Sequence, residues 1–224
     1  MNWRISVMNR DNVNKMIFWS LLYIFLYSVC TVIANLYLPN LLLLAVGISG
    51  AVYIMLNLFC IQYKRERLFI NGLVGAMSVM CIGIWFGKHF DLESSISIGA
   101  VVTTMDIISF TRIGKKTVNA KAMSNKSVAA KLFVYGREKN DVLIPTCGFG
   151  DYLYYAMWIS GTHALSSSGI SYAFVAFMVF AGTILQSITV KVLAKRDGFK
   201  GFPGTAFPFL CTVLAYLLLY YQGI

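Results

Sequence analysis

The sequence has few charged residues: only 12% of its 224 residues are Asp, Glu, Lys or Arg. Soluble domains average about 25% charged and about 45–50% apolar residues. Here hydrophobic residues reach 58%, and the mean hydropathy is +0.69. This composition excludes a soluble enzyme, a disordered tail and a nucleic-acid-binding module.

Motifs for metal or nucleotide binding are also missing. The five cysteines lie far apart within apolar stretches and form no C-x-x-C or other metal-binding spacing, so we interpret them as small apolar fillers. They are Cys30, Cys60, Cys81, Cys147 and Cys211. No glycine-rich phosphate loop stands at a strand–helix junction. The sequence therefore predicts neither a metal site nor a disulfide framework.

Long apolar stretches dominate the chain. A helix needs about 20 mostly apolar residues to cross a bilayer. Seven stretches meet this requirement approximately, so the sequence predicts an all-α polytopic membrane protein with about seven transmembrane helices. The expected spans are 17–38, 41–63, 68–87, 96–113, 142–163, 169–192 and 202–222. The first is too long for a cleaved signal sequence, so we expect it to remain as an anchor.

The net charge of +10 has an uneven distribution along these spans. With seven crossings, 18 of the 19 basic residues fall on one side, and Lys88 alone falls on the other. The basic segments are the N-terminus, the 64–67 turn, the 112–141 loop and the 191–200 loop. The positive-inside rule then predicts a cytoplasmic N-terminus and an external C-terminus. The positive charge is thus an orientation signal with some attraction to anionic lipid, and it does not indicate nucleic-acid binding.

Two acidic residues stand out against this background. Of nine acidic residues, only Asp106 and Asp151 fall inside predicted spans. A carboxylate at that depth is costly and is a functional hypothesis by default. Counted along helical spans, the two aspartates lie about 9 Å and about 14 Å from the same membrane face, so we expect them at similar depths. Two facing carboxyls sharing a proton can act as general base and general acid on an amide, or as a proton relay or cation site.

The residues around the second aspartate are more specific. A G-x-G-D sequence is formed by Gly148, Phe149, Gly150 and Asp151. It follows an intramembrane aspartate and a hydrophilic loop, and it precedes an aromatic-rich segment. This order resembles the G-x-G-D intramembrane aspartyl proteases of the presenilin and signal-peptide-peptidase type. The resemblance implies that Asp106 and Asp151 are the catalytic pair and that Gly148, Phe149 and Gly150 form the active-site motif.

A third matching segment begins the last predicted span, where the family has a proline-alanine-leucine motif that docks substrate. The residues that correspond to this docking motif are Pro203, Thr205, Ala206, Phe207 and Pro208. In the alignment that fits the family motif best, Thr205 takes the place of its proline and Phe207 the place of its leucine. The family usually has nine spans and a tyrosine before its first aspartate, whereas this chain has seven expected spans and Met105. We therefore expect two N-terminal spans of the presenilin-like fold to be absent.

The resemblance divides the chain into an N-terminal region, 1–95, and a catalytic region, 96–224, which contains the basic loop 112–141. It implies an endopeptidase in the cell membrane that cleaves transmembrane helices or signal-peptide-like remnants, with no cofactor and no obligatory partner subunit. The loop lacks an apolar plug, so we expect activity without autocleavage. Prepilin-type peptidases fit less well, because they typically carry lysine where this chain has Leu153.

Two other interpretations of the aspartates remain open. A proton- or cation-coupled transporter would use the same pair as a relay, since no intramembrane lysine or arginine accompanies them. A non-catalytic scaffold would retain only the fold, and the retention of both aspartates argues against it.

Overall fold

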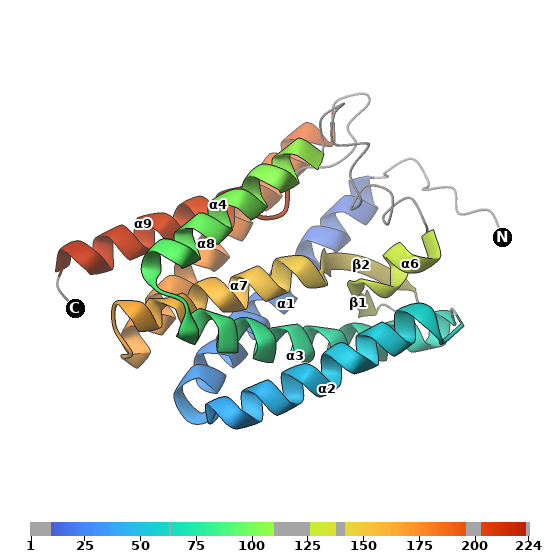
Figure 1. Cartoon of the computed structure of the whole chain (residues 1–224). Helices are drawn as coiled ribbons and strands as arrows, with labels where there is room; N and C mark the ends of the chain where they lie inside the picture. The colour runs from blue at the N-terminus through green and yellow to red at the C-terminus, as the bar shows by residue number, and fades with distance from the viewer. Residues whose placement is uncertain (1–9, 63, 110–125, 138–141, 196–202, 223–224) are drawn as a thin grey trace.

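A computed structural model describes residues 10–62, 64–109, 126–137, 142–195 and 203–222. These residues are helical apart from one short β-hairpin (Figure 1). The elements are α1 (Arg10–Tyr37), α2 (Asn40–Phe59), α3 (Arg65–His89), α4 (Leu92–Ser109), α6 (Lys126–Lys131), β1 (Phe133–Arg137), β2 (Leu143–Gly148), α7 (Phe149–Gly161), η3 (Thr162–Ala164), α8 (Gly169–Leu193) and α9 (Ala206–Gln222).

Helix α7 is the most enclosed helix and lies between α3 and α4 (Figure 1). Trp158 and Ile159 have no exposed surface. Glycines on α3 let the two helices approach closely: a methyl group on Gly83 would lie 2.6 Å from the backbone oxygen of Leu153. These contacts join the predicted N-terminal and catalytic regions through one shared core.

Helix α1 is attached to α7 by buried hydrogen bonds. The Tyr27 hydroxyl donates to the backbone oxygen of Tyr152 over 2.7 Å, and the Asn35 amide donates to Ser160 Oγ over 2.8 Å. Side-chain hydrogen bonds of this kind connect helices in a membrane, where lipid offers polar groups no alternative partner. They fix α7 to α1.

Helix α9 packs against α8 and α4. A methyl group on Gly182 of α8 would lie 2.5 Å from the Cα of Pro208, so α8 and the first turn of α9 are in backbone contact. On the other side, the atoms nearest to a methyl group on Gly99 of α4 would belong to the Phe209 and Trp158 rings. The start of α9 is therefore fixed relative to both α4 and α7.

Five described helices, α1, α2, α3, α4 and α8, are long and apolar enough to cross a membrane. Their lengths indicate a multi-pass helical membrane protein. Helix α9 has 17 residues and α7 has 13, which correspond to about 26 Å and about 20 Å. Both are shorter than the roughly 30 Å hydrocarbon core. The expected number of seven spans stays a prediction.

The predicted helix over 142–163 is wrong in its first third, because residues Leu143–Gly148 form strand β2. This strand pairs antiparallel with β1, with Tyr135 opposite Pro145 and Arg137 opposite Leu143. Proline and glycine disfavour a helix here: Pro145 lacks an N–H, and Gly148 precedes the first helical residue. Asp151 therefore lies in the first turn of α7 and not in a long helix, so its depth cannot be counted along helical turns.

A buried lysine anchors this hairpin to α2. Lys131 is 7% exposed, and its Nζ donates to the backbone oxygens of Asn57 over 2.7 Å and Ile61 over 2.6 Å. Asn57 lies in the last turn of α2, and Ile61 follows the end of that helix, where unpaired carbonyls favour a positive charge. Because β1 begins two residues after Lys131, this contact positions the hairpin against α2.

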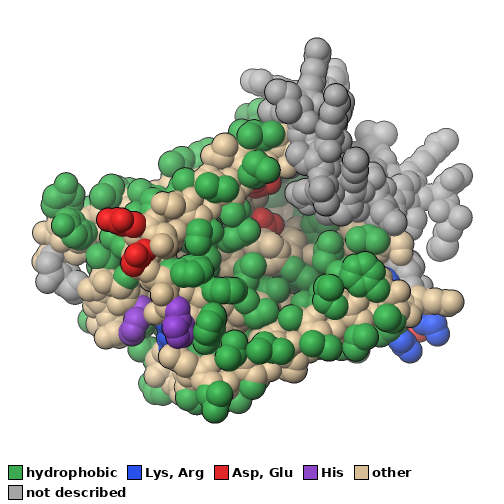
Figure 2. All heavy atoms as spheres, viewed as in Figure 1, with side chains coloured by type: hydrophobic (Ala, Val, Ile, Leu, Met, Phe, Trp, Pro, Cys, Tyr) green, Lys and Arg blue, Asp and Glu red, His purple; other side chains and the backbone are tan. Residues whose placement is uncertain are grey.

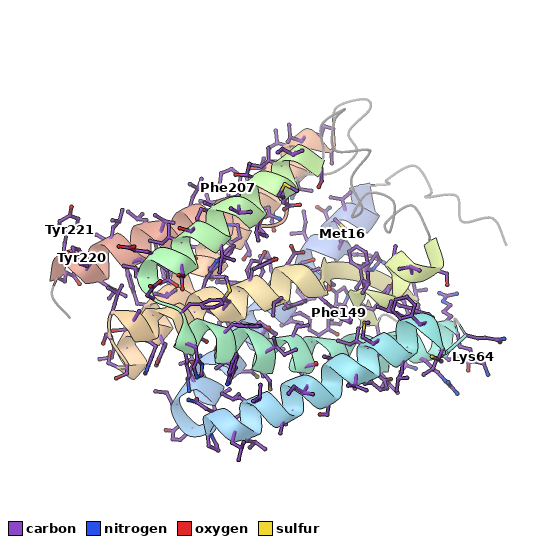
Figure 3. The ribbon with its side chains drawn as sticks, in the orientation of Figure 1. Met16, Lys64, Phe149, Phe207, Tyr220 and Tyr221 are labelled. Atoms are coloured by element: carbon purple, nitrogen blue, oxygen red, sulfur yellow. The ribbon has the colours of Figure 1, made fainter. Side chains whose placement is uncertain are left out.

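Replacing Lys131 by methionine is expected to lower the free energy of unfolding by about 2 kcal/mol, because the α2 carbonyls lose charged hydrogen-bond donors. Thermal unfolding in detergent measures the effect. The control is Lys64→Met, because Lys64 is exposed and extends away from the body at the start of α3 (Figure 3). Equal unfolding temperatures for the two variants would contradict the anchoring role.

Candidate active site

The two aspartates of the predicted spans come from different helices that flank the same hollow. Asp106 lies near the C-terminal end of α4, and Asp151 lies in the first turn of α7. Both side chains are half-buried. Figure 2 shows acidic atoms set back in a hollow between the surfaces formed by α4 and α7. A recessed position of this kind shields carboxyls from lipid while leaving one side of each accessible.

Both carboxyl groups meet the short segment that precedes α9. The Thr205 backbone N–H and hydroxyl both donate to Asp106 Oδ2, over 3.1 Å and 3.0 Å. The neighbouring residue, Gly204, faces Asp151, and a methyl group there would lie 2.7 Å from Asp151 Oδ1. Consecutive residues of one segment thus contact the two aspartates, so this segment is where α4 and α7 converge.

The segment is held in place from several sides. The Tyr155 hydroxyl on α7 donates to the backbone oxygen of Gly204 over 2.9 Å. Pro203 is buried, and Pro208 packs against Gly182 of α8. The Thr205 backbone oxygen accepts the first hydrogen bond of α9, from the N–H of Phe209 over 2.9 Å. The position of residues 203–205 is therefore set by α7, α8 and α9 together.

The predicted docking residues have different surroundings. Thr205 contacts Asp106 directly, whereas Pro208 contacts α8. Ala206 and Phe207 begin α9 and are half-buried. Sequence reasoning did not identify Gly204 or Tyr155 as site residues. Gly204 sits inside the predicted motif, so its small size was an available signal, whereas the long-range bond of Tyr155 left no signal in the sequence.

The G-x-G-D residues also have separate roles. The Gly148 backbone N–H donates to Asp151 Oδ2 over 3.2 Å, which ties the carboxyl to the start of its own helix. Phe149 is buried and packs against Gly75 of α3, between α7 and α3 (Figure 3). A methyl group on Gly150 would meet nothing within 4 Å. Beside Asp151 the surface is therefore open at Gly150.

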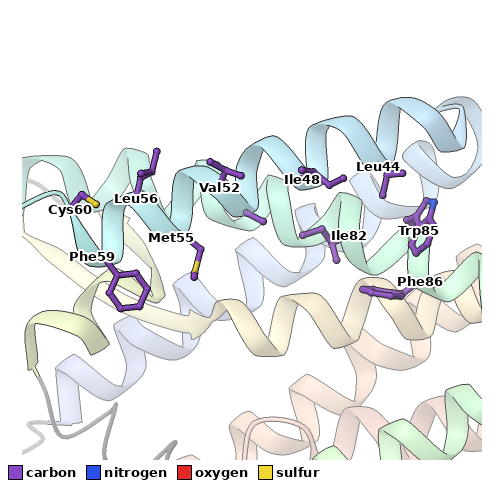
Figure 4. A pocket seen from close by; sticks show the side chains of 11 residues that line it. Leu44, Ile48, Val52, Met55, Leu56, Phe59, Cys60, Ile82, Trp85 and Phe86 are labelled. Carbon is purple, nitrogen blue, oxygen red and sulfur yellow. The ribbon is translucent and has the colours of Figure 1, made fainter.

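A second hollow lies elsewhere, between α2 and α3 (Figure 4). It measures about 590 Å³ and is lined by apolar side chains, among them Val52, Met55 and Phe86. It contains no carboxyl group, so it is not a candidate for acid–base chemistry. Its lining suits contact with lipid acyl chains.

Within the described residues, no group of three or more His, Cys, Asp or Glu side chains is arranged to hold a metal ion. The chemical groups that meet at the candidate site include two carboxyls, the Thr205 hydroxyl, the Tyr155 hydroxyl and backbone amides. Two carboxyls at one place can share a proton, because like charges disfavour ionising both. Such a pair can activate water and protonate a carbonyl oxygen.

Comparison with known proteins finds no matching family model, no similar curated protein and no similar solved structure.

Proposed function

We propose that the chain is an intramembrane aspartyl endopeptidase in which Asp106 and Asp151 are the catalytic pair. The observation that carries this proposal is the convergence of both aspartates on Gly204 and Thr205, in the segment that the sequence resemblance assigns to substrate docking. A proton or cation relay does not require a chain segment such as residues 203–205 in contact with both carboxyls.

The pair hydrolyses an amide with all protons accounted for. One carboxylate takes a proton from water as the water oxygen attacks the carbonyl carbon. The other aspartate gives its proton to the carbonyl oxygen, which yields a neutral diol. When the C–N bond breaks, the first aspartate returns its proton to the nitrogen and the second regains one from the diol. The pair ends in its starting state without a cofactor.

The substrate is a transmembrane helix or a signal-peptide-like remnant. A helical amide must unwind before it can react, and its freed backbone groups then need partners. Among the described strands, β2 has β1 as its one neighbour, so one β2 edge has no strand partner. This strand leads directly into the turn that carries Asp151. An unwound substrate segment can pair with such an edge beside the catalytic pair.

Topology follows from the same assignment. Strand β2 and helix α7 together span about 39 Å, enough to cross the hydrocarbon core. Non-helical backbone at membrane depth is tolerated where protein covers it or where it lines a water-filled cavity. We infer seven crossings in the cell membrane, with a cytoplasmic N-terminus, an external C-terminus and activity as an intact single chain. The bilayer and the substrate helix are its partners.

The test is cleavage of a single-span reporter helix by the purified protein in liposomes made with ¹⁸O-labelled water. We expect two products, one labelled oxygen in the new carboxyl terminus, and loss of cleavage when an aspartyl-protease transition-state analogue is added. Cleavage that persists with the analogue would contradict an aspartyl mechanism. Proton or cation flux that requires both aspartates, with no cleavage and no analogue binding, would identify a transporter instead.

A further inference from the structure

We propose that Thr205 is a positioning residue that keeps Asp106 as the charged member of the pair, so that Asp106 acts as the base and Asp151 as the proton donor. This inference rests on the proposed function, to which it adds the division of labour between the aspartates.

Two hydrogen-bond donors meet on one oxygen of Asp106. Asp106 Oδ2 accepts from both the N–H and the hydroxyl of Thr205, over 3.1 Å and 3.0 Å. Thr205 is 2% exposed, so water does not compete freely for these donors. Hydrogen bonds to an ionised acceptor are stronger than neutral ones. Two of them on the same oxygen favour the carboxylate form of Asp106.

Thr205 also lies at the start of α9. Its backbone oxygen accepts from the N–H of Phe209, so Thr205 caps a helix of 17 residues. The N-terminal end of a helix carries partial positive charge from its aligned peptide dipoles. Asp106 accepts from the capping residue and therefore lies at that positive end, which stabilises its negative charge further.

Asp151 has less support for a charge. Among the residues that the structure describes, its donor is the Gly148 N–H, at the longer distance of 3.2 Å. It also lies in the first turn of a helix, α7, so the helix dipole alone does not separate the two aspartates. The nearby Tyr155 hydroxyl donates to Gly204 and not to a carboxyl group. The difference between the aspartates therefore comes from Thr205.

The residue type at position 205 is essential to this arrangement. Proline there would lack both the N–H and the hydroxyl, and valine would lack the hydroxyl while keeping a similar shape. Serine would keep both donors. These three substitutions separate the hydrogen bonds from the volume of the side chain.

Cleavage kinetics give the first readout. Thr205→Val is expected to lower kcat about tenfold with little change in KM, because a charged hydrogen bond is lost from the base. Thr205→Ser, which keeps the hydroxyl, is expected to restore kcat, and Thr205→Pro is expected to lose more than Thr205→Val. A rise in KM alone, or no restoration by Thr205→Ser, would overturn the positioning role, since a purely structural contact would act through substrate binding.

Infrared difference spectroscopy gives a second readout that needs no cleavage. Subtracting the spectrum of Asp106→Asn from that of wild type isolates the Asp106 stretching bands. We expect a carboxylate band at neutral pH and the higher-frequency band of a protonated acid to increase in Thr205→Val. A protonated Asp106 in wild type would overturn the inference. Because these bands do not depend on turnover, failure of the reporter assay would refute the endopeptidase while leaving this result decisive for Thr205.

Discussion

Asparagine in place of Asp106 or of Asp151 is expected to lower kcat/KM for a transmembrane reporter by up to about 10⁴-fold, since acid–base catalysis contributes about 10²–10⁴-fold. Asparagine keeps the size of the side chain but can neither take nor give the proton. The double variant is expected to lose little more than either single one, because two groups that act as a unit give non-additive effects. Initial rates over a range of reporter concentrations, measured in liposomes, provide the comparison.

The matched control is Asp91→Asn. Asp91 lies before α4 at the other end from Asp106, and it accepts the Ser94 backbone N–H over 2.7 Å. Hydrogen bonds from Ser94 lower the pKa of Asp91 below its ordinary value, so the control also removes a full charge at neutral pH. Asparagine also caps helices well. An equal loss of activity in Asp91→Asn would mean that charge removal, and not position, causes the effect.

The residues of the candidate site were easier to predict than the structure that carries them. Asp106 and Asp151 could be selected because carboxylates are rare in membrane spans. The strand before α7 was missed, because a short apolar run fits a buried strand and a buried helix equally well. Pro145 and Gly148 were the signals against a helix there. The apolar stretch was long enough for a membrane span, and this favoured a helix more strongly than those two residues disfavoured it.

Long-range polar contacts were beyond prediction for a different reason. The sequence indicates that Lys131 is one of several positive charges in a basic loop. In the structure its ammonium group is buried at the end of α2. Likewise, the Tyr155 bond to Gly204 joins residues 49 positions apart. No periodic pattern in the sequence predicts either contact, because each depends on how whole helices pack. Side-chain type restricts what these groups can bind, and tertiary structure selects the partner.

The contacts at Gly204 lead to the second large expected effect. Gly204→Ala is expected to lower kcat/KM by about 10²-fold, because displacing a catalytic group by about 1 Å can cost that much. The added methyl group would lie 2.7 Å from Asp151 Oδ1, so the carboxyl or the segment before α9 must shift. The Tyr155 and Thr205 hydrogen bonds resist a shift of the segment, so most of the displacement falls on Asp151.

Gly150→Ala separates this effect from the general cost of a larger residue at the site. Its methyl group would meet nothing within 4 Å, and alanine favours the helix more than glycine does by up to about 1 kcal/mol. We therefore expect Gly150→Ala to unfold at a temperature no lower than wild type and to bind the transition-state analogue, while Gly204→Ala binds it more weakly. Wild-type analogue affinity in Gly204→Ala would show that residues 203–205 leave Asp151 when the site is occupied, and the close contact would then belong only to the unliganded protein.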